Sequence, residues 1–317
     1  MPFRQVFVAG FPAIAVRSAD LEFVVVPALG ARITNLRRLP GREWLWRSDQ
    51  IPLALPVAGE SYIETADSGG WDECFPTVGP CPMPGNPALQ LPDHGELWSA
   101  PWQSRVYELA GGTAFTGTVQ GSLLPYEFHR EVVLDHQDPV IRFHYRLRHR
   151  GLESFPFLWS AHPLFNVQPG TALTLPSVHS MRVDAAHGGP EQREQDVAWP
   201  LEGGGGSFVF PGDREFAVKL FGDIGPSGRA ILTDPVKGER LEFVIPPAQI
   251  GQVGLWINCR GWAPPGMTPY YNLGLEPCIG SPDRLDDAVE RWRMAAVLEP
   301  GEVREWGFEV WLFGEGE

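Results

Sequence analysis

The strongest constraint on the fold is a regular alternation of apolar and polar side chains with a period of two residues. In the segment VIRFHYRLRH (140–149), apolar side chains alternate with Arg or His from Ile141 to Arg148. Residues 21–30, 215–222, 240–246 and 304–314 show the same pattern. A helix would need a period of 3.6, so these segments are predicted to be strands with one buried face.

Frequent turn signals separate these segments. The chain contains 36 glycines and 32 prolines, and turn sequences recur roughly every ten residues, a spacing typical of antiparallel β-sandwiches. An all-β fold with few short helices is therefore predicted. One short helix is expected at 281–292, after a Ser-Pro start. Because the strand pattern runs from end to end, residues 1–317 are expected to form a single domain.

Charge and cysteine content narrow the range of partners and locations. The formal net charge of −14 suits neither nucleic acid nor an anionic membrane, so a small neutral molecule or a cation is expected instead. The sequence has no run of 18 apolar residues, and its N-terminus lacks the layout of a secretory signal. Four cysteines do not make a disulfide framework, so they are expected to be free thiols in a reducing, cytoplasmic compartment.

Three titratable residues stand in surroundings that suit them poorly. His94 lies in the Gly- and Pro-rich approach to LPDHGELW, His162 interrupts the apolar run FPFLWSAHPLFNV, and Glu276 follows the apolar run in YYNLGLEPC. A buried imidazole or carboxylate costs free energy unless it is paired or has a function. His162 is equally compatible with a hydrogen-bonded core histidine. Three such groups on separated segments nevertheless predict one convergent site.

Tryptophans near His94 point to a ligand with a flat apolar face. The chain has 12 tryptophans, and Trp71 and Trp98 flank the His94 segment. A pyranose ring presents an apolar C–H face to aromatic rings, so both are candidate sugar-binding residues. Packing inside the loop or the core is the alternative. No Arg cluster of the kind that binds phosphate lies near His94 in the sequence, which favours a free sugar over a sugar phosphate.

Four segments, in order, are similar to segments of one known family. GARITNLRRLPGREWLW is similar to an early strand pair, and GGWDECFPTVG followed by LPDHGELW is similar to the stretch that leads to the family's first histidine. SAHPLFNV is similar to an N-H-P-Y-F-N-L strand, and NLGLEPCIGSPD with the later LEPGE is similar to G-L-C-L-E-x-Q and L-x-P-G-E. Over residues 20 to 313 the chain thus resembles the aldose 1-epimerase (mutarotase) family, which implies a galactose-mutarotase-like β-supersandwich.

The resemblance implies a role for each of the three titratable residues. Glu276 would be the general base and His162 the general acid, while His94 would bind and orient the sugar near its ring oxygen. These residue types suit an isomerase that interconverts α and β anomers. Ring opening removes a proton from the C1 hydroxyl and delivers one to the ring oxygen, which a carboxylate and a protonated imidazole can do. Neither step requires a metal or an organic cofactor.

Two family features have no clear copy in this chain. Galactose mutarotases carry an Asn-Arg segment before the first histidine, whereas this chain reads SYIETADSGGWDECF and offers Asp72 and Glu73. The family's Y-D-H-N-F segment has an aspartate that contacts the sugar, and the candidate for it here is Asp213 in PGDREFAVKLF. Asp72 and Asp213 are therefore expected to bind the sugar, whose identity stays open.

Three functions are compatible with the sequence. The leading expectation is a mutarotase, monomeric or homodimeric, that acts on a neutral aldose. The second is a catalytically silent sugar-binding or sensing protein on the same fold, although a binder needs no base opposite an acid. The third is a glycoside hydrolase or lyase. A hydrolase needs two carboxylates about 5–9 Å apart, so Asp72 or Glu73 would have to partner Glu276.

Overall fold

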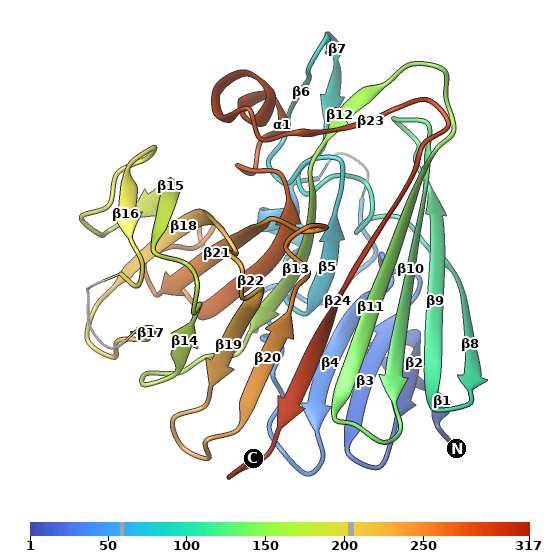
Figure 1. The fold of residues 1–317 in the computed structure, drawn as a ribbon, viewed down its shortest axis with the longest axis vertical. Helices are drawn as coiled ribbons and strands as arrows, with labels where there is room; N and C mark the ends of the chain where they lie inside the picture. Colours follow the sequence, from blue (N-terminus) through green and yellow to red (C-terminus); the bar gives the residue numbers. More distant parts are fainter. Residues whose placement is uncertain (58–59, 202–205) are drawn as a thin grey trace.

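Two large antiparallel sheets form the protein in the computed structural model, which describes residues 1–57, 60–201 and 206–317 (Figure 1). The eleven-stranded sheet has the spatial order β1 (Phe3–Val8), β2 (Phe11–Arg17), β3 (Leu21–Val26), β4 (Arg32–Arg38), β5 (Trp71–Cys74), β13 (Trp159–Phe165), β22 (Tyr271–Ile279), β21 (Gln252–Cys259), β18 (Phe216–Asp223), β15 (Ser180–His187) and β16 (Asp196–Ala198).

The nine-stranded sheet covers one face of the first. Its order is β17 (Ser207–Val209), β14 (Ala172–Thr174), β19 (Arg229–Thr233), β20 (Arg240–Val244), β24 (Val303–Phe313), β11 (Val140–His149), β10 (Tyr126–Asp135), β9 (Gly112–Gln120) and β8 (Gln103–Leu109). In Figure 1 the blue strands β1 to β4 lie behind β8 to β11 and β24. Two small sheets pair β6 (Cys81–Met83) with β7 (Asn86–Leu91) and β12 (Phe155–Phe157) with β23 (Ala296–Leu298).

The predicted one-sided burial is confirmed in β11 and β24. It is wrong for β3 and β18, which are buried on both faces because the eleven-stranded sheet has the core on one side and covering loops or the cavity on the other. β11 coincides with 140–149, and its buried residues alternate with half-buried or exposed Arg and His. The all-β expectation is therefore confirmed. The helix expected at 281–292 is shorter: a single turn α1 (Leu285–Asp287) continues into a π-helical turn η2 (Ala288–Trp292), and a second such turn, η1, spans Tyr62–Ala66. No helix in the described part of the chain is long and apolar enough to cross a membrane.

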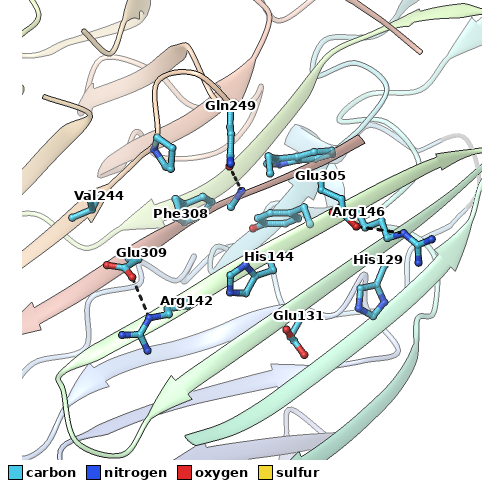
Figure 2. Close-up of a pocket in the computed structure, with 14 residues that line it drawn as sticks. His129, Glu131, Arg142, His144, Arg146, Val244, Gln249, Glu305, Phe308 and Glu309 are labelled. Carbon is cyan, nitrogen blue, oxygen red and sulfur yellow. Dashed lines mark hydrogen bonds and ion pairs between the residues drawn. The ribbon is translucent and has the colours of Figure 1, made fainter. Parts of the chain in front are cut away.

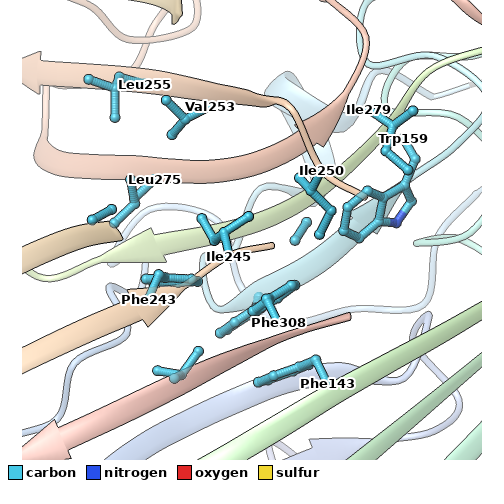
Figure 3. Close-up of a cluster of buried hydrophobic side chains, with 14 of the residues drawn as sticks. Phe143, Trp159, Phe243, Ile245, Ile250, Val253, Leu255, Leu275, Ile279 and Phe308 are labelled. Carbon is cyan, nitrogen blue, oxygen red and sulfur yellow. The ribbon is translucent and has the colours of Figure 1, made fainter. Parts of the chain in front are cut away.

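The core lies between the two sheets. Figure 3 shows Phe143, Phe243 and Phe308 of the nine-stranded sheet together with Val253, Leu255 and Leu275 of the eleven-stranded sheet. All six are at most 3 % exposed. Burying a side chain of this size stabilises the fold by about 1.5–3 kcal/mol. The main buried cluster contains residues from Val16 to Leu312, so it spans almost the whole chain. That residues 1–317 form a single domain stays a prediction.

The alternation also gives the eleven-stranded sheet a second face, directed away from the core. In β5 the side chains of Trp71 and Glu73 pack toward the nine-stranded sheet, so Asp72 and Cys74 point the other way. In the register between β5 and β13, His162 lies opposite Asp72. Directly paired residues share a face, so these strands place an imidazole, a carboxylate and a thiol on the same side.

Candidate active site

The structure brings His94, His162 and Glu276 together. His162 belongs to β13 and Glu276 to β22, and these two strands are neighbours in the sheet. The loop after β7 carries His94 over them, so that the His94 and His162 ring centroids are 4.9 Å apart. Nε2 of His162 is 3.9 Å from Oε1 of Glu276. All three side chains are nearly or fully buried, so the predicted convergence is what the fold produces.

A cavity of about 200 Å³ opens above this group. It is lined by Ile63, Asp67, Val78, His94, His162, Leu164, Ala185, His187, Lys219, Trp256, Trp262, Tyr270 and Asp283. Trp256 and Trp262 meet edge to face at 5.6 Å and form an aromatic wall. The volume lies below the about 300–1,000 Å³ of pockets for drug-sized ligands, so the cavity suits one small ring rather than a chain of sugars.

Glu276 lies directly behind the residues that line the cavity. Its side chain is fully buried, and Oε2 accepts a hydrogen bond of 2.6 Å from Nζ of Lys219. The same Nζ lies 3.2 Å from Oδ1 of Asp283. Oε1 has no hydrogen-bond partner among the described residues. A Cβ at position 274 would lie 2.7 Å from this oxygen, so Gly274 makes room for it. One oxygen of Glu276 is thus fixed by a cation, and the other remains able to accept a proton.

The backbone holds His94 in an unusual conformation. Its φ is 59°, in the left-handed region that non-glycine residues seldom adopt. Strained backbone of this kind concentrates at functional sites. The next residue must be glycine, because a Cβ at Gly95 would lie 2.0 Å from the carbonyl oxygen of Phe75. Nδ1 of His94 is 2.8 Å from Oδ1 of Asp93, which leaves Nε2 as the nitrogen that is available to a ligand.

The two imidazoles favour opposite charge states. Burial lowers the pKa of His94, but the carboxylate of Asp93 and other nearby acids more than offset this and raise it above 6.5. For His162, burial first and then the positive charges of His94 and Lys219 lower the pKa well below 6.5. Of the two rings, His94 therefore takes up a positive charge more readily than His162 does. The sequence-based expectation placed the acidic proton on His162.

Tyr62 packs against the ring of His94, and Asp72 holds Tyr62 in place by a hydrogen bond. The ring of Tyr62 stacks on the His94 ring at 3.9 Å, and its hydroxyl donates a 2.8 Å hydrogen bond to Oδ2 of Asp72. Arg32 donates to the other oxygen of Asp72 at 2.8 Å, so both carboxylate oxygens are occupied. Asp72, expected to bind sugar, thus lies beside the site and acts on it through Tyr62.

The other expected sugar-binding residues lie off the cavity. Trp71 is fully buried in the core, where it stacks on Phe143 at 4.5 Å. Trp98 packs its edge against Tyr62 at 5.0 Å and donates from Nε1 to the Asp93 carbonyl oxygen at 3.0 Å, so it supports the His94 loop. Asp213 is exposed in the loop before β18 and does not line the cavity.

Several groups of the site were missed by sequence reasoning. Lys219 is a charged residue within the apolar strand EFAVKLFG, and its side chain lies on the sheet face opposite those of Val218 and Leu220. A lysine in such a run was a sequence signal that could have identified it as a site residue. Asp67 lines the cavity, and burial raises its pKa to about 6. Burial also raises the pKa of Asp283, although Lys219 opposes the rise. Nothing in the local sequence distinguished Asp67 from a surface residue, and Asp283, although it ends the family-like segment NLGLEPCIGSPD, was given no role.

A second hollow, of about 600 Å³, lies over β10, β11 and β24 of the nine-stranded sheet (Figure 2). Its charged side chains form surface ion pairs between strands, such as Arg142 with Glu309 at 3.1 Å and Arg146 with Glu305 at 3.7 Å. Exposed pairs of this kind are typical of a solvated sheet face. The cavity at His94 and Glu276 is therefore the better candidate for chemistry.

The two sheets define a galactose-mutarotase-like fold, and solved structures of this fold match almost the whole chain. A candidate aldose 1-epimerase of Klebsiella pneumoniae has 14% sequence identity and a TM-score of 0.71, over 96% of this chain and 80% of that protein. A candidate mutarotase of Salmonella typhimurium has 14% identity and a TM-score of 0.69, over 99% and 94%.

A galactose mutarotase-like protein of Lactobacillus casei has 17% identity and a TM-score of 0.63, over 95% of this chain and 99% of that protein. No protein-family model matches the chain, and no curated protein matches it. At these identities the likeness establishes the fold alone, since one fold can support several functions. The case for a function therefore rests on the geometry of the site.

Proposed function

We propose that the protein is an aldose 1-epimerase that interconverts the α and β anomers of one neutral aldopyranose. The observation that carries this proposal is the arrangement of Glu276. Its Oε1 is buried, lacks a hydrogen-bond partner among the described residues, and lies 3.9 Å from an imidazole nitrogen of His162. This arrangement adjoins a cavity of about 200 Å³ with aromatic walls. A base opposite an acid, at a cavity that holds one ring, is what anomer exchange requires.

In this mechanism Oε1 of Glu276 accepts the proton of the C1 hydroxyl. Because Glu276 lies behind the lining residues, C1 must approach between His162 and Lys219. The ring oxygen receives a proton from this pair of imidazoles, of which His94 has the higher pKa and His162 lies beside Glu276, and the pyranose opens to the aldehyde. Rotation about the C1–C2 bond presents the other face, and the ring closes with the proton transfers reversed. Each acid or base typically contributes about 10²–10⁴-fold to the rate.

The charges around the cavity favour a neutral sugar. Among the described residues that line it, the only Lys or Arg is Lys219, which is already bound by Glu276 and Asp283. A sugar phosphate or uronate would need an unoccupied cation of this kind. Trp256 offers an aromatic surface for the apolar face of a pyranose. A cytoplasmic location and a monomeric or homodimeric state remain part of the proposal.

Polarimetry with freshly dissolved α-aldoses tests the proposal. We expect Glu276→Gln to lower the rate of mutarotation by about 10²–10⁴-fold while sugar binding, measured by calorimetry, persists. The matched control is Glu22→Gln, because Glu22 is also buried and ion-paired, to Arg37, on a strand far from the cavity. Normal turnover by Glu276→Gln would show that the assigned base is wrong.

The same assay separates the alternatives. Wild-type protein that binds an aldose but does not accelerate its mutarotation would be a binding or sensing protein. Cleavage of an oligosaccharide would indicate a hydrolase or lyase. The carboxylates that the sequence offered as partners for Glu276 in a hydrolase are engaged elsewhere: Arg32 and Tyr62 hold Asp72, and Glu73 faces the core.

A further inference from the structure

Three buried side chains beside the cavity carry donor atoms that suit a metal ion. One donor atom each of Cys74, His94 and His162 lies within 4.8 Å of the other two. We propose that these three residues bind a single Zn²⁺ or a similar divalent transition-metal ion, which acts as a competitor of the sugar and not as a cofactor. The competition rests on the proposed function, whereas the metal site does not.

The donor set selects the class of ion. Thiolate and imidazole are the ligands of Zn²⁺ and related transition metals, whereas Mg²⁺ and Ca²⁺ take oxygen ligands. A tetrahedral ion at about 2.3 Å from sulfur and 2.0–2.1 Å from nitrogen needs donors about 3.4–3.6 Å apart. The three donor atoms lie within 4.8 Å of one another, so small side-chain rotations would bring them to this separation. Three protein ligands leave a fourth position, which faces the cavity because His94 and His162 line it.

Two features prepare the histidines for this role. The carboxylate of Asp93 holds Nδ1 of His94 at 2.8 Å, and a carboxylate is one of the groups that orient metal-binding histidines in this way. Nδ1 of His162 is buried and has no hydrogen-bond partner among the described residues. A buried polar atom without a partner is costly, and coordination of the ion through this Nδ1 would offset that cost.

The strands explain how the thiol joins the two rings. Cys74 and His162 project from the same face of the eleven-stranded sheet, on the adjacent strands β5 and β13. The thiol must lose its proton to the buffer when the ion binds. An ion held here would engage both imidazoles of the proposed acid pair, so the sugar could not use them.

Titration of the full-length, metal-free protein with Co²⁺ tests the site directly. We expect one ion per chain and the near-ultraviolet absorption that a cobalt–thiolate bond gives. Cys74→Ser should lose that band, whereas Cys259→Ser should keep it, because Cys259 is equally buried but lies outside the triangle. Asp93→Asn should weaken binding by about 10–100-fold, as expected for loss of a residue that orients a ligand. Zn²⁺ should displace the Co²⁺.

Absence of the thiolate band in the wild type, or an unchanged Co²⁺ dissociation constant in a folded Cys74→Ser, would overturn the proposal. His162→Asn provides an independent check if Cys74→Ser does not fold. The result does not depend on catalysis: a protein that binds Co²⁺ through Cys74 yet leaves every aldose unchanged would refute the epimerase proposal and support the metal site. If both hold, Zn²⁺ should raise the apparent KM for the sugar without changing kcat.

Discussion

Replacing Lys219 by methionine tests the electrostatic organisation of the site. Nζ of Lys219 lies 2.6 Å from Glu276 and 3.2 Å from Asp283, and its side chain is only 6 % exposed. Removing one partner of a buried ion pair typically costs about 3–5 kcal/mol, because the remaining charge is left without compensation. Lys219→Met leaves the fully buried Glu276 without its cation and the partly exposed Asp283 with less compensation, so we expect its free energy of unfolding at neutral pH to fall by about this amount.

Thermal unfolding followed by calorimetry measures the loss. An unfolding entropy of about 2.1 cal/mol/K per residue gives about 0.67 kcal/mol/K for 317 residues. A loss of about 3–5 kcal/mol then lowers Tm by about 4–8 °C. The control is Lys237→Met, which removes the chain's other lysine from an exposed turn and should leave Tm nearly unchanged.

The pH dependence of the loss gives a second, independent readout. Burial raises the pKa of Asp283, and Lys219 opposes that rise, so the pKa should climb further in Lys219→Met. A group whose pKa is higher in the folded state contributes stability at low pH and loses it as the pH rises through that pKa. The deficit should therefore be smaller at pH 5 than at pH 8. A deficit under about 1 kcal/mol, the size expected for an exposed pair, would refute the reasoning, and so would one that grows on acidification.

Three further changes separate the roles of neighbouring residues. Asp93→Asn removes the carboxylate that raises the pKa of His94, so in an NMR titration His94 should release its proton at lower pH than in the wild type. Burial raises the pKa of Asp67 from 3.8 to about 6, so the folded wild type loses stability as the pH rises through this range. Asp67→Asn removes the titrating group, so the free energy of unfolding should depend less on pH between these values. Trp71→Phe should lower Tm but leave sugar affinity unchanged, whereas Trp256→Ala should weaken calorimetrically measured sugar binding by about 2- to 10-fold.

The fold was predictable because alternation is a local property that the chain repeats many times. Residues 140–149 read as a half-buried strand, and β11 has those bounds and that burial. The order of strands in each sheet was not predictable in the same way. β5 pairs with β13, and β13 with β22, across separations of more than eighty residues, and such pairings depend on tertiary packing rather than on local sequence.

The site was predictable where a polar residue conflicted with its surroundings. His162 and Glu276 interrupt apolar runs, and His94 precedes a glycine in an aromatic loop, so each conflict was visible in the sequence. Asp67 and Asp283 gave no such conflict, because both occupy polar loops. The fold buries Asp67 and covers Asp283 in part. A tryptophan is as suitable in an apolar core as in the wall of a cavity, so its sequence surroundings do not reveal which it occupies. The sequence therefore could not show that Trp71 packs in the core whereas Trp256 lines the cavity.

The comparison of Glu73 with Glu276 shows how the fold separates a structural carboxylate from a chemical one. Both are fully buried. Glu73 faces the core and accepts hydrogen bonds from Arg130 at 3.0 Å, Tyr145 at 3.0 Å and Trp159 at 3.1 Å, so both of its oxygens are engaged. Glu276, on the other face of the sheet, has a cation on one oxygen and a histidine too distant for a hydrogen bond near the other. Glu73 is enclosed in the core with donors on both oxygens, so no ligand can reach it, whereas Glu276 has an oxygen without a hydrogen-bond partner beside a cavity and is placed to accept a proton from a ligand.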